Sequence, residues 1–543
     1  MDFTLFRLRD DIDEFDDFVR IQEGQTPSVQ YGPIAGPAFR AKLYVSNSVP
    51  NPPIWAPLLE TGFPASAPWP LSATSSALLL LRVEQDNAGH YFAFAFGQRG
   101  RYLLRDGSYH RRYGLRTALN LIADPNTPPK LRAFETARHS QNILRARLQA
   151  TAASSIEVFE LDLLRDIVRH ATGVPVDVER WGKRVGGSDA LRIAADLSWA
   201  DLGKFCLAVD AVASGTDYRQ QFGWIDYMNQ VSDKQLVETL EDHVVELLRT
   251  GQTGLVRLAP PEIVDWDLIV RFQYHFDTRS DVRRYDISLD SYLAGLKHND
   301  PQLVGLSADK LRSRHIIGLN ADGSRVNEWS VWRCLAAEFE HDGATYVLDD
   351  GSFYNVDSDY LDRLNSTIIP YARSNPFLPP SPSGVTEPKY NQSAAANSDN
   401  FLLLDADEIH YGGPGGVELC DILTSSRQLV HVKRYSGSAT LSHLFAQARN
   451  SAELLLTNRD FRTAARDHIR DLPNSDPRFD FINAENIQTS EFEVVLAIIK
   501  KWGDAGIDTL PFFAKVSLRR ALMDLTSWGY IVSVERVPVG DAD

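Results

Sequence analysis

The sequence predicts a multi-domain α+β protein, and three observations lead to that fold class. The chain has 543 residues, which is too long for a single hydrophobic core. Strand-like runs such as SALLLLRVEQ alternate with segments of helical periodicity such as DKQLVETLEDHVVELLRT. After residue 400 the order becomes two strands, helix, strand, helix, strand, which is typical of a mixed sheet covered by helices.

Composition shifts divide the chain into four segments. We expect an N-terminal α+β domain over residues 1–140 and a mixed α/β middle domain over 141–375. A Pro-, Ser- and Asn-rich stretch at residues 374–400, SNPFLPPSPSGVTEPKYNQSAAANSDN, marks a linker or long surface loop. We assign 376–400 to this linker and a first helix, between the middle and C-terminal domains. In the middle domain SQNILRARLQA is predicted to be helical, and ATYVLDDGSFYNVD predicts a hairpin with a DG turn.

The C-terminal domain, residues 401–543, has the most regular pattern. VELCDIL and QLVHVKRY are predicted strands, and SHLFAQARNSAELLL is a predicted helix with Leu444, Ala448 and Leu455 on one face. FEVVLAIIKKW predicts a buried strand, VSLRRALMDLTSWG a helix that ends at a glycine, and YIVSVERVPV a final strand.

Bulk composition narrows the class of protein. Hydrophobic residues make up 43% of the chain and charged residues 24%, as in ordinary globular proteins. No apolar run is long enough for a membrane span, the N-terminus lacks a signal-peptide pattern, and the three cysteines match no zinc spacing. These features predict a reduced, cytoplasmic protein that does not interact with membranes. The formal charge of -16 argues against a chain coated in nucleic acid, although a local basic site is compatible with it.

One segment is basic although the chain as a whole is acidic. GQRGRYLLRDGSYHRRYGLR, residues 97–116, interleaves arginines with tyrosines, and its DG predicts a hairpin. Arginines bind phosphates and tyrosines stack on bases, so the segment is a candidate nucleic-acid contact. A solvated hairpin paired with acidic neighbours is the alternative. The candidate contacts are Arg99, Arg101, Arg105, Tyr109, Arg111, Arg112, Arg116 and, farther along the chain, Arg434.

The chemistry-bearing stretch is GGPGGVELCDILTSSRQLVHVKRYSG, residues 412–437. Glu418 and Asp421 precede a polar turn, and His431 and Lys433 follow it on the next strand. Phosphodiester hydrolysis needs a hard cation that polarises the phosphate and activates water, and carboxylates are the ligands Mg²⁺ prefers. Because strand side chains alternate between faces, a regular strand cannot aim both acids at one metal, whereas a bulge can.

An acid, a short turn and then HVK resemble the PD-(D/E)xK nuclease superfamily, and GGVELCDIL with LVHVKRYSG is most similar to its Mrr-like restriction branch. The resemblance implies a restriction-endonuclease-like mixed sheet and a bound Mg²⁺ or Mn²⁺. It implies that Asp421 or Glu418 holds the metal together with a helix acid, for which Glu387 is the first candidate and Glu408 the second. Lys433 would orient the attacking water and stabilise charge.

Two further residues take roles from the same resemblance. His431 stands where the superfamily has Asp, Glu or Gln, and an imidazole suits manganese better than magnesium, so it would assist the metal or position water. Gln447, on the helix after the lysine strand, matches a glutamine often found near such sites. The carbonyl of Val432 is a further candidate metal ligand.

The expected function is a metal-dependent nuclease that cleaves DNA, or alternatively RNA. A nuclease-like fold that has lost cleavage and only binds nucleic acid or a partner protein is the competing hypothesis. Pieces such as FGWIDYMNQV, KYNQSAA and VHVKRYSGSATLSHLFAQ also resemble a sporadically distributed bacterial family of unknown function. That resemblance implies a mobile-element or phage-defence setting, with a homo-oligomer or a defence-system protein as partner.

Overall fold

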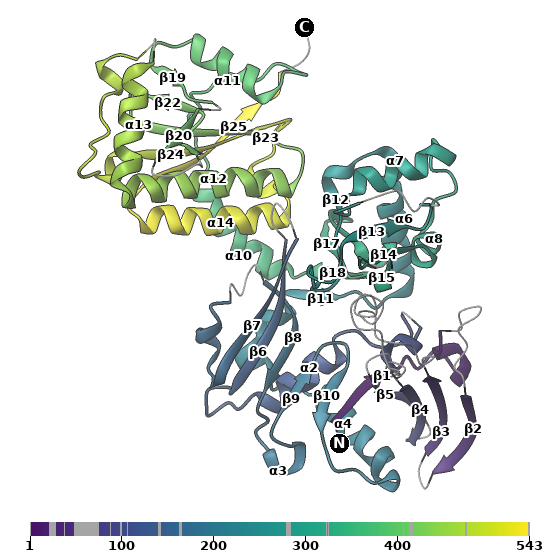
Figure 1. Ribbon diagram of the computed structural model, residues 1–543. Coiled ribbons are helices and arrows are strands. Elements are labelled where there is room, and N and C mark those ends of the chain that lie inside the picture. Colours follow the sequence, from purple (N-terminus) through teal and green to yellow (C-terminus); the bar gives the residue numbers. More distant parts are fainter. Residues whose placement is uncertain are drawn as a thin grey trace, which may run out of the picture. The chain divides into compact units, whose positions relative to one another are not determined.

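The computed structural model (Figure 1) describes residues 2–20, 29–36, 39–47, 75–86, 88–97, 100–105, 107–139, 143–161, 166–277, 284–321, 323, 325–405, 407–411, 416–472 and 475–540. The predicted multi-domain α+β fold is confirmed. The chain forms two compact units, of which unit 1 is Met1–Ala137 with Ala146–Ile225 and unit 2 is Arg138–Arg145 with Asp226–Asp543. Unit 1 thus extends to Ile225, beyond residue 140, where we expected the N-terminal domain to end.

A ten-stranded sheet, in the order β2-β3-β4-β5-β1-β10-β9-β8-β6-β7, organises the first part of the chain. Apolar side chains of α2 and α4 fill one face, and a smaller apolar cluster around Phe18 and Tyr44 fills the other. The elements are β1 (Asp2–Arg7), β2 (Val29–Gly36), β3 (Phe39–Asn47), β4 (Ser75–Gln85), β5 (Ala88–Phe96), α2 (Tyr113–Ile122), β6 (Leu131–His139), β7 (Ile143–Ser154), β8 (Asp166–Gly173), α3 (Val178–Trp181), β9 (Val185–Gly187), β10 (Leu191–Ala194), α4 (Leu202–Ala213) and α5 (Arg219–Phe222).

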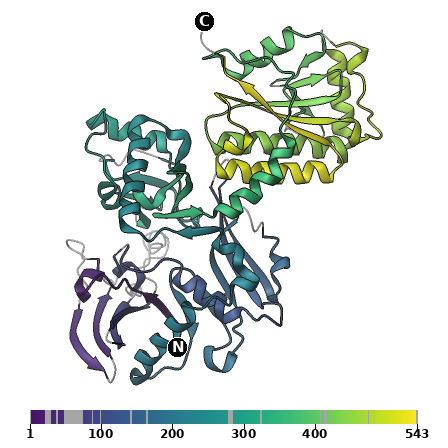
Figure 2. The same ribbon diagram turned by 180° about the vertical axis from the view of Figure 1, so that it is seen from behind.

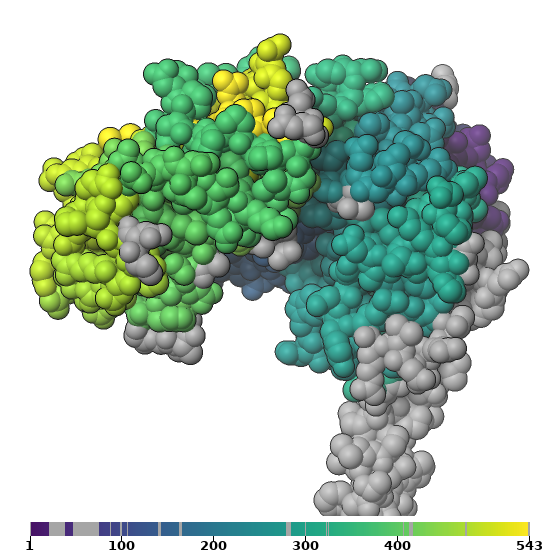
Figure 3. Space-filling view, turned by 90° about the horizontal axis from the view of Figure 1, so that it is seen from above, coloured from purple at the N-terminus to yellow at the C-terminus, as the bar shows by residue number. Residues whose placement is uncertain are grey.

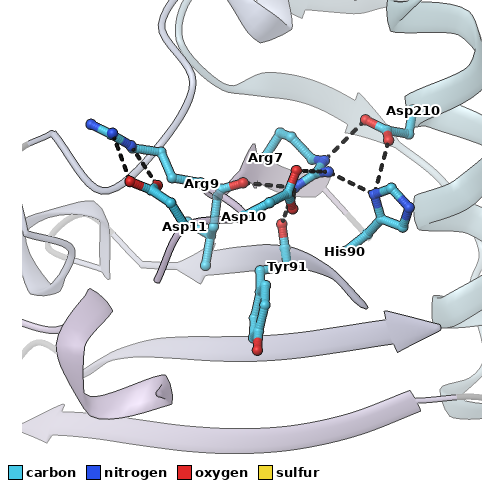
Figure 4. A network of polar contacts seen from close by, with 8 residues as sticks. Arg7, Arg9, Asp10, Asp11, His90, Tyr91 and Asp210 are labelled. Carbon is cyan, nitrogen blue, oxygen red and sulfur yellow. Dashed lines mark hydrogen bonds and ion pairs between the residues drawn. The ribbon is translucent and has the colours of Figure 1, made fainter. Parts of the chain in front are cut away.

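A buried arginine joins three elements of unit 1 (Figure 4). The Arg7 guanidinium donates to both carboxylate oxygens of Asp10 at 2.8 Å, to Asp210 on α4 at 3.2 Å, and lies 2.7 Å from His90 Nδ1 on β5. Its side chain is only 7% exposed, so these partners offset the cost of burying a charge. The cluster therefore fixes β1 against β5 and α4.

The predicted Arg/Tyr-rich hairpin is wrong. Residues Gly100–Leu103 form a 3-10 helix, and α2 begins at Tyr113. Between them Leu104 and Tyr109 make isolated bridges to Val19 and Leu8, not to each other. A turn does form here, since the Ser108 N–H donates to the Arg105 carbonyl and Gly107 has a positive φ, but the residues on either side of it bridge to Val19 and Leu8.

Ile143–Ser154 is a strand, so the predicted helix over SQNILRARLQA is also wrong. Its hydrogen-bonded neighbour is β6, and this non-local pairing overrides the local periodicity. The tip of the β6–β7 pair belongs to unit 2. There His139 stacks on Phe513 with ring centroids 4.5 Å apart, and its Nε2 lies 3.6 Å from the buried Asp349 carboxylate, which Arg145 also approaches at 3.5 Å.

The middle part of unit 2 contains two antiparallel sheets, β11-β18-β17-β16-β12 and β13-β14-β15. The DG hairpin is confirmed: β17 and β18 are joined through Asp350 and Gly351, which both have positive φ. The helix over DKQLVETLEDHVVELLRT is confirmed as α6. The elements are β11 (Met228–Gln230), α6 (Lys234–Thr250), β12 (Val256–Leu258), β13 (Arg271–Tyr274), α7 (Leu289–Asn299), α8 (Ala308–Ser313), β14 (His315–Leu319), β15 (Arg325–Ser330), α9 (Val331–Cys334), β16 (Leu335–His341), β17 (Ala344–Asp349) and β18 (Ser352–Val356).

A mixed five-stranded sheet, β19-β22-β23-β24-β25, forms the centre of the C-terminal part. β22 and β23 are antiparallel, whereas β23, β24 and β25 run parallel, as the strand and helix order predicts. The elements are α10 (Ser358–Ile368), α11 (Glu387–Ala396), β19 (Phe401–Leu403), β20 (Glu408–His410), β21 (Gly416–Glu418), β22 (Ile422–Thr424), β23 (Gln428–Arg434), α12 (Ser438–Thr457), α13 (Arg459–Asp471), β24 (Glu493–Lys500), α14 (Phe512–Ser527) and β25 (Ile531–Pro538).

Helices cover both faces of this sheet. Figures 1 and 2 show α12 and α14 side by side on one face and α11 on the other. Leu429, Leu496 and Leu444 belong to the larger core under α12 and α14, while Val430, Val432 and Tyr390 belong to the smaller core under α11. In Figure 3 the green atoms around residues 380–430 pack directly against the yellow-green atoms of the later elements.

The stretch expected to be a linker packs along the edge of this sheet. Ser381 bridges Val539, and the buried Leu378 donates its N–H to Glu535 on β25 at 2.6 Å. The predicted first helix of the stretch is α11. Its position next to β23 brings Glu387 to the end of that strand.

One buried carboxylate connects the two parts of unit 2. Glu338 on β16 accepts the hydroxyl of Ser438, at the start of α12, at 2.7 Å. Its other oxygen accepts the N–H of Phe513, at the start of α14, at 2.8 Å. Glu338 therefore caps one helix and anchors the beginning of a second.

Among the residues that the structure describes, no helix has both the length and the apolar character required to cross a membrane.

Candidate catalytic site in the C-terminal part

The two acids of VELCDIL come together because this stretch is broken. It was expected to be one strand, but β21 ends at Glu418 and β22 begins at Ile422, with the buried Leu419 and Cys420 between them. β21 pairs with β20, whereas β22 pairs with β23. The break removes the strict alternation of strand side chains, and Glu418 lies close enough to Asp421 to raise its pKa.

Lys433 and Glu387 form the centre of the site. The Lys433 ammonium lies 2.7 Å from Oε1 of Glu387, and the backbone N–H of Arg434 donates to Oε2 at 2.9 Å. The Lys433 and Glu387 side chains are 21% and 19% exposed, so the pair is largely shielded from water but still reachable. The helix acid expected from the resemblance thus contacts the expected lysine. Glu408, the second candidate, lies on β20 opposite Glu418.

Asp421 contacts the same end of β23 that carries Lys433. Its Oδ2 accepts the N–H of Val432 at 2.7 Å. Burial raises the pKa of Asp421 to about 8, and the negative charges of Asp405, Glu387 and Glu418 add to the rise. The pKa of Glu418 is also raised, first by burial and then by Asp405, while the Lys433 charge opposes the rise. Burial and the neighbouring carboxylates therefore shift both Asp421 and Glu418 towards the protonated form.

His431 lies apart from these contacts. The side chain is 4% exposed, and its one side-chain hydrogen bond among the described residues joins Nε2 to the Ser451 hydroxyl of α12 at 3.4 Å. Burial lowers the pKa of His431 to about 3, so the imidazole is neutral at pH 7. The structure does not bring His431 into contact with the carboxylates, and packing between β23 and α12 accounts for its position.

Helix α12 contributes Gln447 and a residue that the sequence reasoning missed. Gln447 Nε2 donates to Glu418 Oε2 at 3.3 Å. His443, one turn earlier, lies within electrostatic range of Lys433 and Glu387, and its pKa is lowered first by burial and then by the Lys433 charge. Asp405, which follows β19, was missed as well. A His-x3-Gln spacing on a helix and an acid directly after a strand were the available signals.

The chemistry of these donors fits a hard divalent cation. Carboxylates with raised pKa values repel one another, and a cation between them would remove that repulsion. No group of three or more His, Cys, Asp or Glu side chains in a metal-holding arrangement occurs among the described residues. Magnesium, however, is commonly held by one or two carboxylates and keeps several waters. Glu387, Glu418 and Asp421 are the residues that would supply those oxygens.

The structure scatters the arginines of residues 97–116. Arg99 lies outside the described residues, while Arg101 and Arg105 are exposed, with Arg101 stacked over the Tyr102 ring at 4.7 Å. Arg111 pairs with Asp189, and Arg112 is buried and donates to the Ile225 carbonyl at 3.2 Å. Tyr109 packs against Phe6, and Arg116 is half-buried on α2. Only part of the predicted set is therefore presented to solvent.

Arg434 lies beside the candidate site. Its guanidinium donates to the Ser381 hydroxyl at 2.6 Å, and its backbone N–H contacts Glu387. The side chain is half-buried and lies next to the strand end that carries Lys433. A phosphate contact by Arg434 remains a prediction.

Comparison with known proteins gives one family. No curated protein and no solved structure matches the chain. A family model described as "Family of unknown function (DUF6119)" matches residues 3–538 and so spans both compact units, including all the residues of the candidate site. The chain therefore belongs to the DUF6119 family of unknown function.

Proposed function

We propose that the C-terminal part is a metal-dependent nuclease that cleaves phosphodiester bonds of DNA, with RNA as the alternative substrate. One observation carries the proposal: the Lys433 ammonium contacts Glu387 at 2.7 Å, at the strand end where Glu387 and Glu418 raise the pKa of the buried Asp421. A lysine beside clustered carboxylates is a combination that can support metal-assisted phosphodiester hydrolysis.

The roles follow from the contacts. A divalent cation, Mg²⁺ or Mn²⁺, would polarise the phosphate and lower the pKa of a bound water. Asp421 and Glu418, with Glu387, supply its oxygen ligands. Lys433 places a positive charge beside them, where it orients the attacking water and stabilises negative charge that develops on the phosphate. Gln447 holds Glu418 through its hydrogen bond and so sets the position of that carboxylate.

The acidic net charge of the C-terminal part indicates that the candidate site does not attract DNA by itself. Residues 385–543 contain sixteen Lys/Arg and twenty-two Asp/Glu, and phosphate neutralisation supplies most non-specific affinity for DNA. We propose that Arg434 and the exposed Arg101 and Arg105 contribute phosphate contacts, and that a homo-oligomer or a defence-system partner supplies the rest.

We also propose a bacterial anti-phage or mobile-element defence setting and a cytoplasmic location. The sequence resemblance described above supports the setting. Three buried cysteines that form no disulfide with one another support a reducing compartment.

A second function is favoured by a different observation. His431 is buried where the resembling nucleases carry an acidic residue or glutamine, and the described residues contain no three-ligand metal group. Loss of one metal ligand would leave a nuclease-like fold that binds nucleic acid or a partner protein without cutting it.

A plasmid-nicking assay with Mg²⁺ and with Mn²⁺ separates the two functions. We expect the wild-type protein to nick DNA with at least one of the ions, and Lys433→Ala to abolish nicking while retaining DNA binding in a mobility-shift assay. Lys501→Ala is the matched control, because Lys501 is an exposed lysine of the same part of the chain. A wild-type protein that binds DNA but never cuts it would refute the nuclease and support the second function.

A further inference from the structure

A cavity in the middle part of unit 2 lies far along the chain from the carboxylates described above. Its volume is about 270 Å³, and it opens between the end of β13, helix α7 and the loop that leads into α8. Pockets for small molecules begin at roughly this size. The cavity therefore has room for a small metabolite and not for a polymer.

One wall of the cavity is aromatic. Phe276 lines it and packs edge-on against Tyr274, with ring centroids 5.5 Å apart, and at a tilt against Tyr292, with centroids 5.6 Å apart. Gly295 on α7 makes this packing possible, because a Cβ at that position would lie 2.2 Å from the Phe276 ring. The absence of a side chain at Gly295 thus lets the far end of the Phe276 ring approach the backbone of α7 closely.

Two cations, Arg314 and Lys310, also line the cavity. Neither Arg314 nor Lys310 has a carboxylate within ion-pair distance among the described residues, although Lys310 Nζ donates to the Gly305 carbonyl at 2.5 Å. The lining carboxylate, Asp300, is occupied by the loop, because it accepts the N–H groups of Val304 at 3.1 Å and Gly305 at 2.9 Å. The cavity therefore holds more positive than negative charge.

His275 adds a neutral polar group. Burial, followed by the nearby Arg314 charge, lowers the pKa of His275 to about 4, so the ring is uncharged at pH 7. A neutral imidazole donates one hydrogen bond and accepts another, and a bound anion would favour its protonation.

We propose that this cavity binds a small organic phosphate with a planar ring, of nucleoside-monophosphate size. Arg314 and Lys310 would bind the phosphate, since a guanidinium and an ammonium are groups that recognise phosphate in proteins. Phe276 would contact the planar ring. The inference is independent of the nuclease proposal, because no residue is shared between the two sites.

Adenosine monophosphate is the probe for a calorimetric test on the full chain, with adenosine and inorganic phosphate in parallel titrations. We expect adenosine monophosphate to bind more tightly than either fragment, and Arg314→Gln or Lys310→Gln to weaken it at least tenfold. Lys297→Gln is the matched control, because Lys297 is exposed on α7 and does not line the cavity. Circular dichroism of each variant shows whether the chain is folded.

A second measurement needs no variant. Acetylation of lysines in the wild-type protein, followed by peptide mass spectrometry, should show that adenosine monophosphate protects Lys310 and leaves Lys297 unchanged. Equal acetylation of Lys310 with and without the nucleotide would overturn the proposal. Adenosine that binds as tightly as its monophosphate would overturn it as well, and so would inorganic phosphate that binds as tightly as the nucleotide.

Discussion

Replacing Asp421 by asparagine should stabilise the protein at alkaline pH. The Asp421 carboxylate is buried among Asp405, Glu387 and Glu418, and its pKa is raised from 3.8 to about 8. Asparagine keeps an oxygen that can accept the Val432 N–H, but it removes the buried charge. The variant therefore measures how much the buried Asp421 charge destabilises the fold, with the hydrogen bond to Val432 retained.

The direction and size of this stabilisation follow from the linkage between proton binding at Asp421 and folding. A carboxyl whose pKa is higher in the folded state loses stability as pH rises from about 4 to about 8, because the unfolded state ionises first. At about 1.4 kcal/mol per pKa unit the full rise sets a ceiling of about 6 kcal/mol. Partial exposure and relaxation of the neighbouring carboxylates reduce this, and we expect Asp421→Asn to gain about 2 kcal/mol at pH 8. That gain corresponds to a rise in melting temperature of about 4–8 °C.

Differential scanning calorimetry of the full chain at pH 5, 6, 7 and 8 measures the effect. The difference between Asp421→Asn and wild type should grow steadily across this range. Asp504→Asn is the control, because Asp504 is an exposed aspartate of the same part of the chain. A melting temperature of Asp421→Asn below that of wild type at pH 8 would refute this prediction. A difference in melting temperature that does not change with pH would refute it as well.

Three more substitutions test other contacts. Glu338→Ala should lower the free energy of unfolding by about 3 kcal/mol, because it leaves the Ser438 hydroxyl and the Phe513 N–H without their buried acceptor. A chemical-denaturation curve unchanged from wild type would contradict this prediction. Gly187→Ala should cost about 3 kcal/mol, since its Cβ would lie 1.8 Å from a backbone oxygen, and thermal melting measures the loss. If the proposed nuclease is active, His443→Asn should slow plasmid nicking by about 10- to 100-fold. The circular dichroism spectrum should stay unchanged, and nicking at the wild-type rate would exclude a role for His443.

Local signals in the sequence predicted several elements of unit 2. The Asp350–Gly351 pair fixed a hairpin because both residues adopt the positive φ that such turns require. Asp233 and Gly251 mark the two ends of α6, where the Asp233 side chain accepts a helix N–H and Gly251 is left-handed. Such features depend on a few adjacent residues and can be read without knowing the tertiary structure.

The errors came from contacts between distant residues. Ile143–Ser154 has helical periodicity, but its pairing with β6 makes it a strand. The residue pair Glu387 and Lys433 was expected only through a family resemblance, because 46 positions separate the two. Asp405 and His443 were missed because their proximity to Glu418 and to Lys433, respectively, depends on how β19 and α12 pack. A linear pattern does not encode such proximity.

The assignment of residues 138–145 to the later unit has a practical consequence for expression of truncated proteins. A fragment that starts at Asp226 would contain Asp349 and Phe513 but would lack His139 and Arg145, which cover them. Its interior would then include Asp349 without two of its basic neighbours and an aromatic ring open to water. During translation the same eight residues leave the ribosome about 200 residues before Asp349, so they can pack into the later unit only after that chain has been synthesised.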